Sequence, residues 1–245
     1  MYLNWDLYLK ESLKIDYPKA RKILTNLVDV TLSEPRTDVL NEIRETIDII
    51  VEQFLEDPRV IDQLTKVAIH DYSTSLHLTN CMLFAFGFAY YKKFDNKRIK
   101  EIGLMGLLHD VGKVKVPDYL LQAARKLSTD EFEIIKKHPV EGYKILKITG
   151  FNENVQNVAL QHHEKLDGSG YPYGIKKESI CYDAQIIGII DIFEALTNFR
   201  PYKKPIDPLD ALKIIKKEVE SGKLNMDIFK EFSYSVVGQK KINKK

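Results

Sequence analysis

Apolar residues recur at three- and four-residue steps through most of this 245-residue chain, a spacing typical of helices that bury one face. The pattern runs through residues 2–15, 18–31 and 37–56, and in the last of these it falls on Leu40, Ile43, Ile47, Ile50 and Phe54. The apolar run at 185–191 fits either a buried strand or a helix, and we favour a helix because the pattern continues beyond it. Alternating strands and hairpin turns are not evident elsewhere. The sequence therefore predicts an all-α fold.

Capping residues mark several helix ends. An Asp-Pro pair at 57–58 offers an N-cap and a first-turn proline for an apolar-periodic stretch that reaches about Phe94. A Ser-x-x-Glu capping box at 128–131 precedes a later helix. A second Asp-Pro pair at 207–208 begins another helix, which we expect Gly222 to end.

A break near residues 56–60 divides the chain. We expect an N-terminal helical region at 1–56, separate from a main domain at 57–238, and a basic C-terminal tail at 239–245. The N-terminal region has three candidate roles, which are to sense a signal, to form a homodimer, or to pack against the main domain. The tail carries four lysines and fits an ordinary solvated terminus.

Charge and cysteine content exclude several classes of protein. The 37 basic and 35 acidic residues give a formal charge of +2, which argues against a nucleic-acid polymer as partner. Two cysteines, Cys81 and Cys181, are too few for a disulfide framework, as expected in a reducing compartment. The N-terminus lacks the apolar stretch of a signal peptide, and the most apolar run, 81–91, is about half the length that crosses a bilayer. We therefore expect a cytoplasmic protein with no membrane partner.

His109 and Asp110 form the first candidate site. They end an apolar stretch at 99–108, where an ionisable pair is costly to bury unless a metal or hydrogen bonds satisfy it. Lys113 follows one turn later, so the three side chains face one cavity if the helix continues that far. Imidazole can bind one ion while a carboxylate bridges two, so the pair suits a two-metal centre. By itself, such a pair also fits a satisfied buried contact at a helix end.

Further candidate ligands lie on or beside predicted helices, at His77, His138, His162, His163 and Asp191. Neighbouring residues on a helix point about 100° apart, so His162 and His163 cannot both pack on one core face. Taken singly, His77 and His138 fit ordinary histidines and Asp191 fits a cap. The joint occurrence of these residues is what indicates a metal site.

Four separated motifs occur in one order, namely HDVGKVKVPDYLL at 109–121, HP at 138–139, HHEKLDGSGYP at 162–172 and DIFEALTNFRPYKK at 191–204. Together they resemble the HD-GYP subgroup of the HD phosphohydrolase superfamily over about residues 65–220. The signature Gly170, Tyr171 and Pro172 is intact, in a long loop at 166–183 that we expect at the surface with Tyr171 near solvent.

The resemblance implies an HD-domain helical bundle whose metal centre hydrolyses cyclic di-GMP. The family's metal-ligand positions fall on His77, His109, Asp110, His138, His162, His163 and Asp191. Its active-site lysine falls on Lys113, and the positions expected to hold substrate phosphates fall on Arg200 and Lys203. Asp110 and Lys113 are thus the expected catalytic residues, with Lys113 stabilising charge or protonating the leaving 3′ oxygen.

Ser73 stands where family members with a third metal carry a glutamate, so we expect two divalent metal ions. Imidazole and carboxylate ligands suit iron or manganese at least as well as zinc. The expected product is linear pGpG, and further cleavage to GMP stays open.

Two other interpretations remain. The same ligands would serve a phosphodiesterase of cyclic GMP-AMP, because the sequence does not locate the base pocket. A catalytically silent module that binds cyclic di-GMP is the second, although the intact ligands and Lys113 argue against it. The GYP loop, 170–172, is equally suited to shape a pocket rim or to dock a signalling partner, and the N-terminal region is a second candidate docking surface.

Overall fold

Helix α5 (Thr74–Tyr91) lies at the centre of the molecule because its sequence is apolar on all sides. Fourteen of its residues are buried, and they are enclosed by α2 (Tyr17–Ser33), α4 (Arg59–Lys66), α6 (Asn96–Leu108), α11 (Tyr182–Thr197) and α13 (Met226–Ile242). The computed structural model describes residues 5–33, 35–57, 59–66, 73–200 and 204–242, and every regular element within them is a helix. The predicted all-α fold is confirmed. Across these ranges, no helix has both the length and the apolar character needed to cross a membrane.

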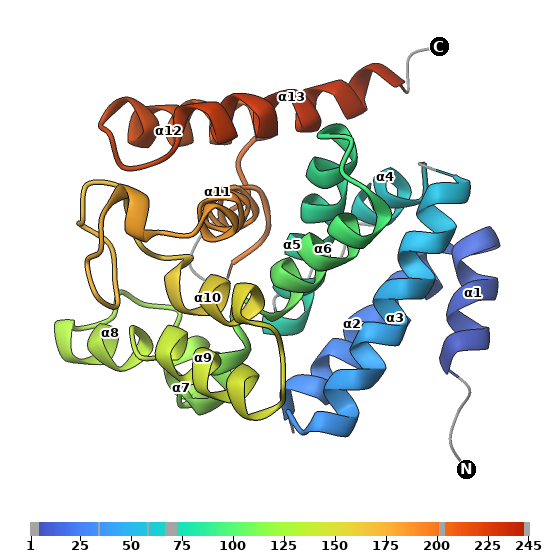
Figure 1. Ribbon diagram of the computed structural model, residues 1–245, viewed down its shortest axis with the longest axis horizontal. Helices are drawn as coiled ribbons and strands as arrows, with labels where there is room; N and C mark the ends of the chain where they lie inside the picture. The colour runs from blue at the N-terminus through green and yellow to red at the C-terminus, as the bar shows by residue number, and fades with distance from the viewer. Residues whose placement is uncertain (1–4, 34, 58, 67–72, 201–203, 243–245) are drawn as a thin grey trace.

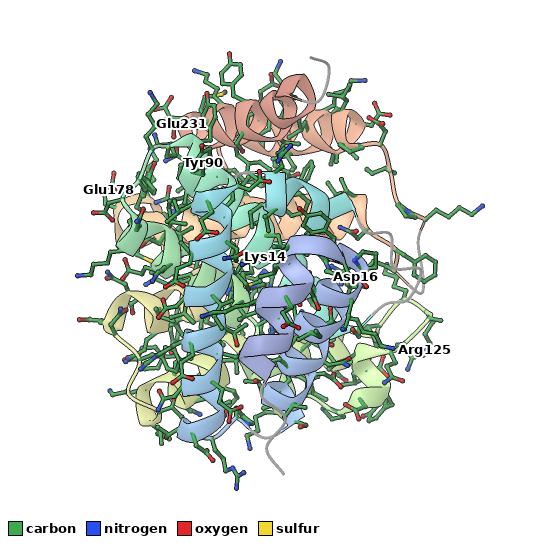
Figure 2. The ribbon with its side chains drawn as sticks, turned by 90° about the vertical axis from the view of Figure 1, so that its right-hand side faces the viewer. Lys14, Asp16, Tyr90, Arg125, Glu178 and Glu231 are labelled. Atoms are coloured by element: carbon green, nitrogen blue, oxygen red, sulfur yellow. The ribbon has the colours of Figure 1, made fainter. Side chains whose placement is uncertain are left out.

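The N-terminal helices cover one face of this core. α1 (Trp5–Ile15), α2 and α3 (Thr37–Glu56) lie in front of the other helices in Figure 2, where Lys14 and Asp16 mark the turn between the first two. Their buried apolar side chains, Leu24 and Ile43 among them, join those of α5 and α6 in one continuous cluster. The expected separation from the main domain is therefore not seen. The boundary between residues 56 and 57 stays a prediction about folding units.

The remaining elements complete the bundle around α11. They are η1 (Val111–Lys115), α7 (Asp118–Leu121), α8 (Thr129–Ile135), α9 (His138–Ile148), α10 (Glu153–Gln161), η2 (Lys177–Ser179) and α12 (Pro208–Glu220). In Figure 1, α12 and α13 lie above α11, and α8, α9 and α10 lie below it. α9 packs against both η1 and α10, and α10 packs against α11. This packing brings the end of α10 close to the start of α9.

Several predicted helix boundaries are confirmed. Ser128 and Glu131 form the capping box at the start of α8. Asp207 caps α12, and Gly222 follows the end of that helix with φ +80°. The break near residues 56–60 separates α3 from α4, and the apolar run at 185–191 lies within α11.

Three expectations about helix length are wrong. The stretch that reaches Phe94 is not one helix, because Ser73 accepts a hydrogen bond from the Leu76 amide and so starts α5 as a new helix. α6 ends at Leu108, so it does not carry Lys113. The expected tail is partly helical, because α13 continues to Ile242.

Candidate metal centre

The seven predicted ligands meet at the ends or inner faces of five helices. His77 lies on α5, His109 and Asp110 follow α6, His138 begins α9, His162 and His163 follow α10, and Asp191 lies on α11. All of them except His163 and Asp191 are at most 2% exposed. The structure thus brings together the whole predicted set, and their role as metal ligands stays a prediction.

Two glycines allow the helices to approach closely enough to form this cluster. A Cβ atom on Gly112 would lie 2.0 Å from the His138 carbonyl oxygen, so only glycine lets η1 pack against the start of α9. A Cβ atom on Gly188 would lie 2.6 Å from the His162 carbonyl oxygen. That glycine lets α11, which carries Asp191, pack against the end of α10.

Three of the histidines are oriented by backbone carbonyl groups. Each lies within hydrogen-bond distance of one through Nδ1, at 2.9 Å for His109 and Gly106, 2.8 Å for His138 and Ile135, and 3.0 Å for His162 and Ala159. Because a carbonyl oxygen only accepts hydrogen bonds, Nδ1 must carry the proton in each ring. The neutral imidazole then has a lone pair on Nε2, which is the state that binds a metal.

The Asp110 carboxylate lies between these Nε2 atoms. Its Oδ1 is 2.9 Å from His138 Nε2 and 3.5 Å from His162 Nε2, and its Oδ2 is 3.4 Å from Nε2 of both His77 and His109. Among the described residues, Asp110 Oδ1 and His109 Nε2 are buried without a hydrogen-bond partner. Unpaired lone pairs that face one another inside a protein are costly unless a cation lies between them. The residues present therefore fit a bound divalent metal.

The ligand atoms divide into two adjacent groups, and within each group they lie within 4.8 Å of one another. The first, here called the His77 group, contains His77, Cys81, His109 and Asp191. The second, the His138 group, contains Asp110, His138, His162 and His163. Because Asp110 Oδ2 also lies beside His77 and His109, its carboxylate reaches both groups, as a bridging ligand between two ions would.

Cys81 is the member of the His77 group that the sequence analysis missed as a ligand. Its side chain is fully buried, and its Sγ lies 3.7 Å from His77 Nδ1. Burial raises the pKa of the thiol to about 12. The sequence does contain a signal, because Cys81 lies four residues after His77 and so shares its helix face.

The electrostatics of the site suit cation binding. Burial lowers the pKa of His138, His162 and His163, so these imidazoles are neutral near pH 7. Burial opposes the charge of Asp110, but the Lys113 ammonium and the neighbouring histidines outweigh it and hold the pKa of this carboxyl well below its usual range. In the His138 group, neutral imidazoles thus lie beside an ionised carboxylate, which is the protonation state that a divalent metal requires. Burial also acts to lower the pKa of His77, but Cys81, Glu194 and Asp110 outweigh it and raise that pKa well above its usual value.

Glu194 on α11 supports His77 from behind. Its Oε2 lies 2.5 Å from His77 Nδ1 and accepts that hydrogen bond, which leaves Nε2 directed toward the group. A carboxylate behind a histidine is the usual partner of a metal-binding imidazole. Glu194 was not among the predicted site residues, although an acidic residue three positions after Asp191 in an apolar helix was a signal.

Arg200 also lies behind His77. Its Nη2 donates to Glu194 Oε2 at 2.6 Å, and the residue is 6% exposed. It also lines a pocket beside His77 and Asp191. Its contact with a substrate phosphate stays a prediction. Lys203, the other predicted phosphate contact, lies outside the described residues.

Lys113 lies beside the metal centre, but on a different element from the expected one. The 3-10 helix η1 carries it, because α6 has already ended before the His-Asp pair. Its Nζ nevertheless donates to Asp110 Oδ2. Lys113 also lines the adjacent pocket, so its ammonium group stands between the metal centre and that space.

A pocket of about 830 Å³ opens beside the centre. His77 and Asp191 line one part of it, and most of the remaining wall comes from α8 and the segment that precedes it. The cationic side chains in its lining are Lys113, Arg125, Lys126, Lys136 and Arg200. Its volume is in the range of small-molecule sites, and its charge suits an anionic ligand.

The GYP loop covers the His138 group. The Tyr171 ring stacks on the His163 ring at a centroid distance of 4.6 Å, and the Tyr171 amide donates to the His163 carbonyl. Tyr171 is half-buried rather than near solvent, and burial raises the pKa of its hydroxyl. Gly170 precedes it, and the bond to Pro172 is cis. The Tyr171 ring also meets the Phe132 ring edge to face at a centroid distance of 6.1 Å, and Phe132 lines the pocket, which supports the interpretation of the loop as a pocket rim.

Ser73 belongs to neither group. Its hydroxyl oxygen accepts from the Leu76 amide at 3.0 Å and lies 2.9 Å from Ser75 Oγ. A side chain used in this way to cap α5 is a poor addition to a metal site, which supports the expectation of two ions.

An all-helical core that gathers imidazole and carboxylate groups around one buried aspartate defines a helical domain whose residues fit a metal ion. The comparison with known families agrees with that class. Residues 71–228 match the family model described as HD domain, so the chain belongs to the HD domain family. The resemblance seen in the sequence motifs is confirmed.

Two relatives are similar in sequence. A Pseudomonas aeruginosa protein named cyclic di-GMP phosphodiesterase is 31% identical over 193 residues, which are 78% of this chain and 46% of the relative. A Vibrio cholerae protein named 3′3′-cGAMP-specific phosphodiesterase 1 is 36% identical over 130 residues, which are 53% of this chain and 30% of the relative. The chain thus spans less than half the length of either curated relative.

A solved structure shares the fold. An HDG"Y"P protein from Bdellovibrio bacteriovorus superposes with a TM-score of 0.75 over 94% of this chain and 75% of its own, at 20% sequence identity. Because the match covers so much of the chain, it includes most of the N-terminal helices together with the HD domain.

Proposed function

We propose that this protein hydrolyses cyclic di-GMP to linear pGpG with the help of two divalent metal ions. The observation that carries the proposal is the position of Asp110, whose carboxylate lies between two groups of ligands beside a pocket lined by cationic side chains. A relative named cyclic di-GMP phosphodiesterase supports the substrate. Cleavage of pGpG to GMP is an open second step.

The residues of the chain position the phosphodiester and manage its charge. Two ions held by the His77 and His138 groups would supply Lewis acidity and lower the pKa of water. Lys113, held by Asp110 at the pocket wall, stabilises negative charge on the phosphate or gives its proton to the leaving 3′ oxygen. Tyr171, stacked over His163, limits the access of solvent from that side.

Iron or manganese is the proposed metal. The imidazole and carboxylate donors suit both ions. Cys81 adds a sulfur atom to the His77 group, and a soft donor favours iron over manganese at that position.

The test replaces the bridging carboxylate. Asp110→Ala should remove bound metal and turnover together, measured by metal analysis of anaerobically purified protein and by chromatography of its cyclic di-GMP products. Asp210→Ala, at an exposed carboxylate on α12, is the control and should keep both. Full turnover or unchanged metal content in Asp110→Ala would overturn the proposal.

Cyclic GMP-AMP is the second candidate substrate, favoured by the relative that is named for it. Phe132 is 42% exposed and lines the pocket, so it is the side chain best placed to stack on a base. A panel of cyclic dinucleotides incubated with the purified protein separates the two candidates. Tight binding without product in iron- or manganese-loaded protein would instead favour a silent binding module.

Location and protein partners extend the proposal beyond the site. The two cysteines are unpaired, which supports a reducing, cytoplasmic location. The GYP loop and the N-terminal helices are the proposed surfaces for a signalling partner, and the N-terminal helices are also the proposed surface for a homodimer.

A further inference from the structure

A buried arginine on helix α2 faces the rear of the metal centre. Arg21 is 2% exposed; its Nη1 donates to the Leu64 carbonyl at 3.0 Å, and its Nη2 donates to Asn80 Oδ1. Neither acceptor carries a charge. Burial lowers the pKa of this guanidinium to about 10, and the carboxylate of Glu194 acts in the opposite direction. Arg21 is therefore a cation at neutral pH, and the carboxylate that compensates its charge, Glu194, lies on the other side of Asn80.

Asn80 connects this cation to the carboxylate that supports His77. Its Nδ2 donates to Glu194 Oε1 at 2.7 Å. A guanidinium group only donates hydrogen bonds and a carboxylate only accepts them. The Asn80 amide therefore satisfies both neighbours in one orientation alone, and Arg21 selects that orientation.

The same network fixes the ring of His77. With Oε1 bound by Asn80, Glu194 presents Oε2 to both His77 Nδ1 and Arg200 Nη2. His77 Nε2 is thereby directed at Asp110 and Asp191, whose nearest oxygens each lie 3.4 Å away. An unbroken series of polar contacts thus runs from α2 to the His77 group.

A second polar contact aligns α2 with α5. Ser75 Oγ donates to Asp29 Oδ1 at 3.2 Å, near the start of α5, while Arg21 meets Asn80 further along it. α2 is therefore held against α5 at two positions along α5, at Ser75 and at Asn80. A shift of α2 would disturb the side of α5 that carries His77. His138 and His162 are instead held by backbone carbonyls three residues before them in the chain.

We infer that Arg21 is a positioning residue for the His77 group, and that the position of helix α2 consequently affects how tightly this group binds a metal ion. Displacement of α2 lowers the affinity of the His77 group for its ion and spares the His138 group. The inference rests on the proposed function, because it requires that the site binds metal. It gives the N-terminal helices a role beyond packing, since a signal that moves them reaches one half of the centre first.

The experiment titrates cobalt(II) into the chelator-treated full chain and follows the number of sites, their affinities and the cobalt absorption bands. The wild type should bind two ions. In Arg21→Met, one site should weaken about tenfold, the lower end of the range for residues behind a metal ligand, while the other stays unchanged. Arg21→Lys keeps the charge and should recover part of the loss. Leu24→Ala, a buried apolar change on the same helix, should lower stability without this selective effect.

Each remaining outcome decides a separate question. If the wild type binds no metal, the proposed function fails. If the wild type binds two ions and Arg21→Met binds both equally well, or if Leu24→Ala weakens the same single site, the inference about Arg21 is overturned. Should Arg21→Met not fold, Arg21→Lys takes its place, because it keeps a cation and a donor for Asn80. Its partial loss must fall on one site alone, and two unchanged sites in it would also overturn the inference.

Discussion

The two halves of the metal centre are held in place by different kinds of partner. In the His138 group, His138 is oriented by the carbonyl of Ile135 at the end of α8, and His162 by that of Ala159 on α10, each three residues earlier in the chain. In the His77 group, His77 depends on Glu194, a side chain that in turn depends on Asn80 and Arg200. A backbone carbonyl moves only with its helix, whereas a side-chain carboxylate holds its position only while each partner stays in place. The His138 group is therefore the more rigid half and the His77 group the more adjustable one.

The pocket lies beside the adjustable half. His77 and Asp191 contribute to its wall, whereas Tyr171 stacks over His163 of the His138 group. His109, although it belongs to the His77 group, is oriented by a backbone carbonyl, so adjustment is concentrated at His77. On the proposed function, one ion would therefore be fixed by the fold, while the other would respond to substrate and to the surrounding helices.

The largest expected difference between the halves follows from Glu194→Gln. The change removes the charge that holds His77 and should weaken one bound ion by about 10–100-fold, the usual effect of altering a partner behind a metal ligand. The ion of the His138 group should be retained. Metal titration with product chromatography measures both effects, and equal weakening of the two ions would contradict the comparison.

The sequence predicts the seven ligands through their motifs, but not the partners that orient them. Glu194 and Asn80 lie in helices that are apolar overall. Their roles depend on a contact between residues that are 114 positions apart in the sequence. Helix periodicity predicts which elements form, but it does not state which polar side chains of separate helices meet. For the same reason, the packing of α2 on α5 followed only from the structure.

Helix ends show a similar limit. The capping box at 128–131 was predictable because both partners lie within one turn. The end of α6 before Lys113 was not, and the segment that follows it packs closely against the start of α9 through Gly112. Local hydrogen bonds are visible in a single sequence, whereas close contacts between helices are not.

Gly112→Ala tests the rigid half. Its new Cβ atom would lie 2.0 Å from the His138 carbonyl oxygen, so η1 and α9 must separate. We expect a loss of about 1–3 kcal/mol in the free energy of unfolding, as for other overpacked sites. The ion of the His138 group should weaken, measured by metal titration, and the ion of the His77 group should change less.

Gly150→Ala is the matched control. Gly150 has φ +76° with no atom within 4 Å of a Cβ, so alanine is strained there by about 1–2 kcal/mol without a clash. Similar destabilisation with both ions retained would attribute the effect of Gly112→Ala to the approach of α9. Selective loss of an ion in Gly150→Ala would contradict that explanation.

The smallest expected effect comes from Glu131, which belongs to the capping box of α8. Helix α8 forms a wall of the pocket and contributes no predicted ligand. The hydrogen bonds from Arg125, labelled in Figure 2, and from the Ser128 amide lower the pKa of Glu131 from 4.5 to about 2. A carboxyl whose pKa is lowered by folding stabilises the folded state above its unfolded value, and this contribution is lost as the pH falls from about 4.5 toward 2. Because the pair is exposed, the gain is small.

Glu131→Gln should therefore lower the melting temperature slightly at pH 7, and the difference from the wild type should vanish as the pH approaches 2. Protonation of the histidines affects both proteins alike, so it cancels in this difference. Metal titration at pH 7 should find both ions retained, because Glu131 lies in the first turn of α8, at the other end from Ile135, whose carbonyl orients His138. A melting difference that does not change with pH would show that the charge of Glu131 is not its cause. The loss of one ion would show that the pocket wall, and not only the partners behind the ligands, holds that half of the centre.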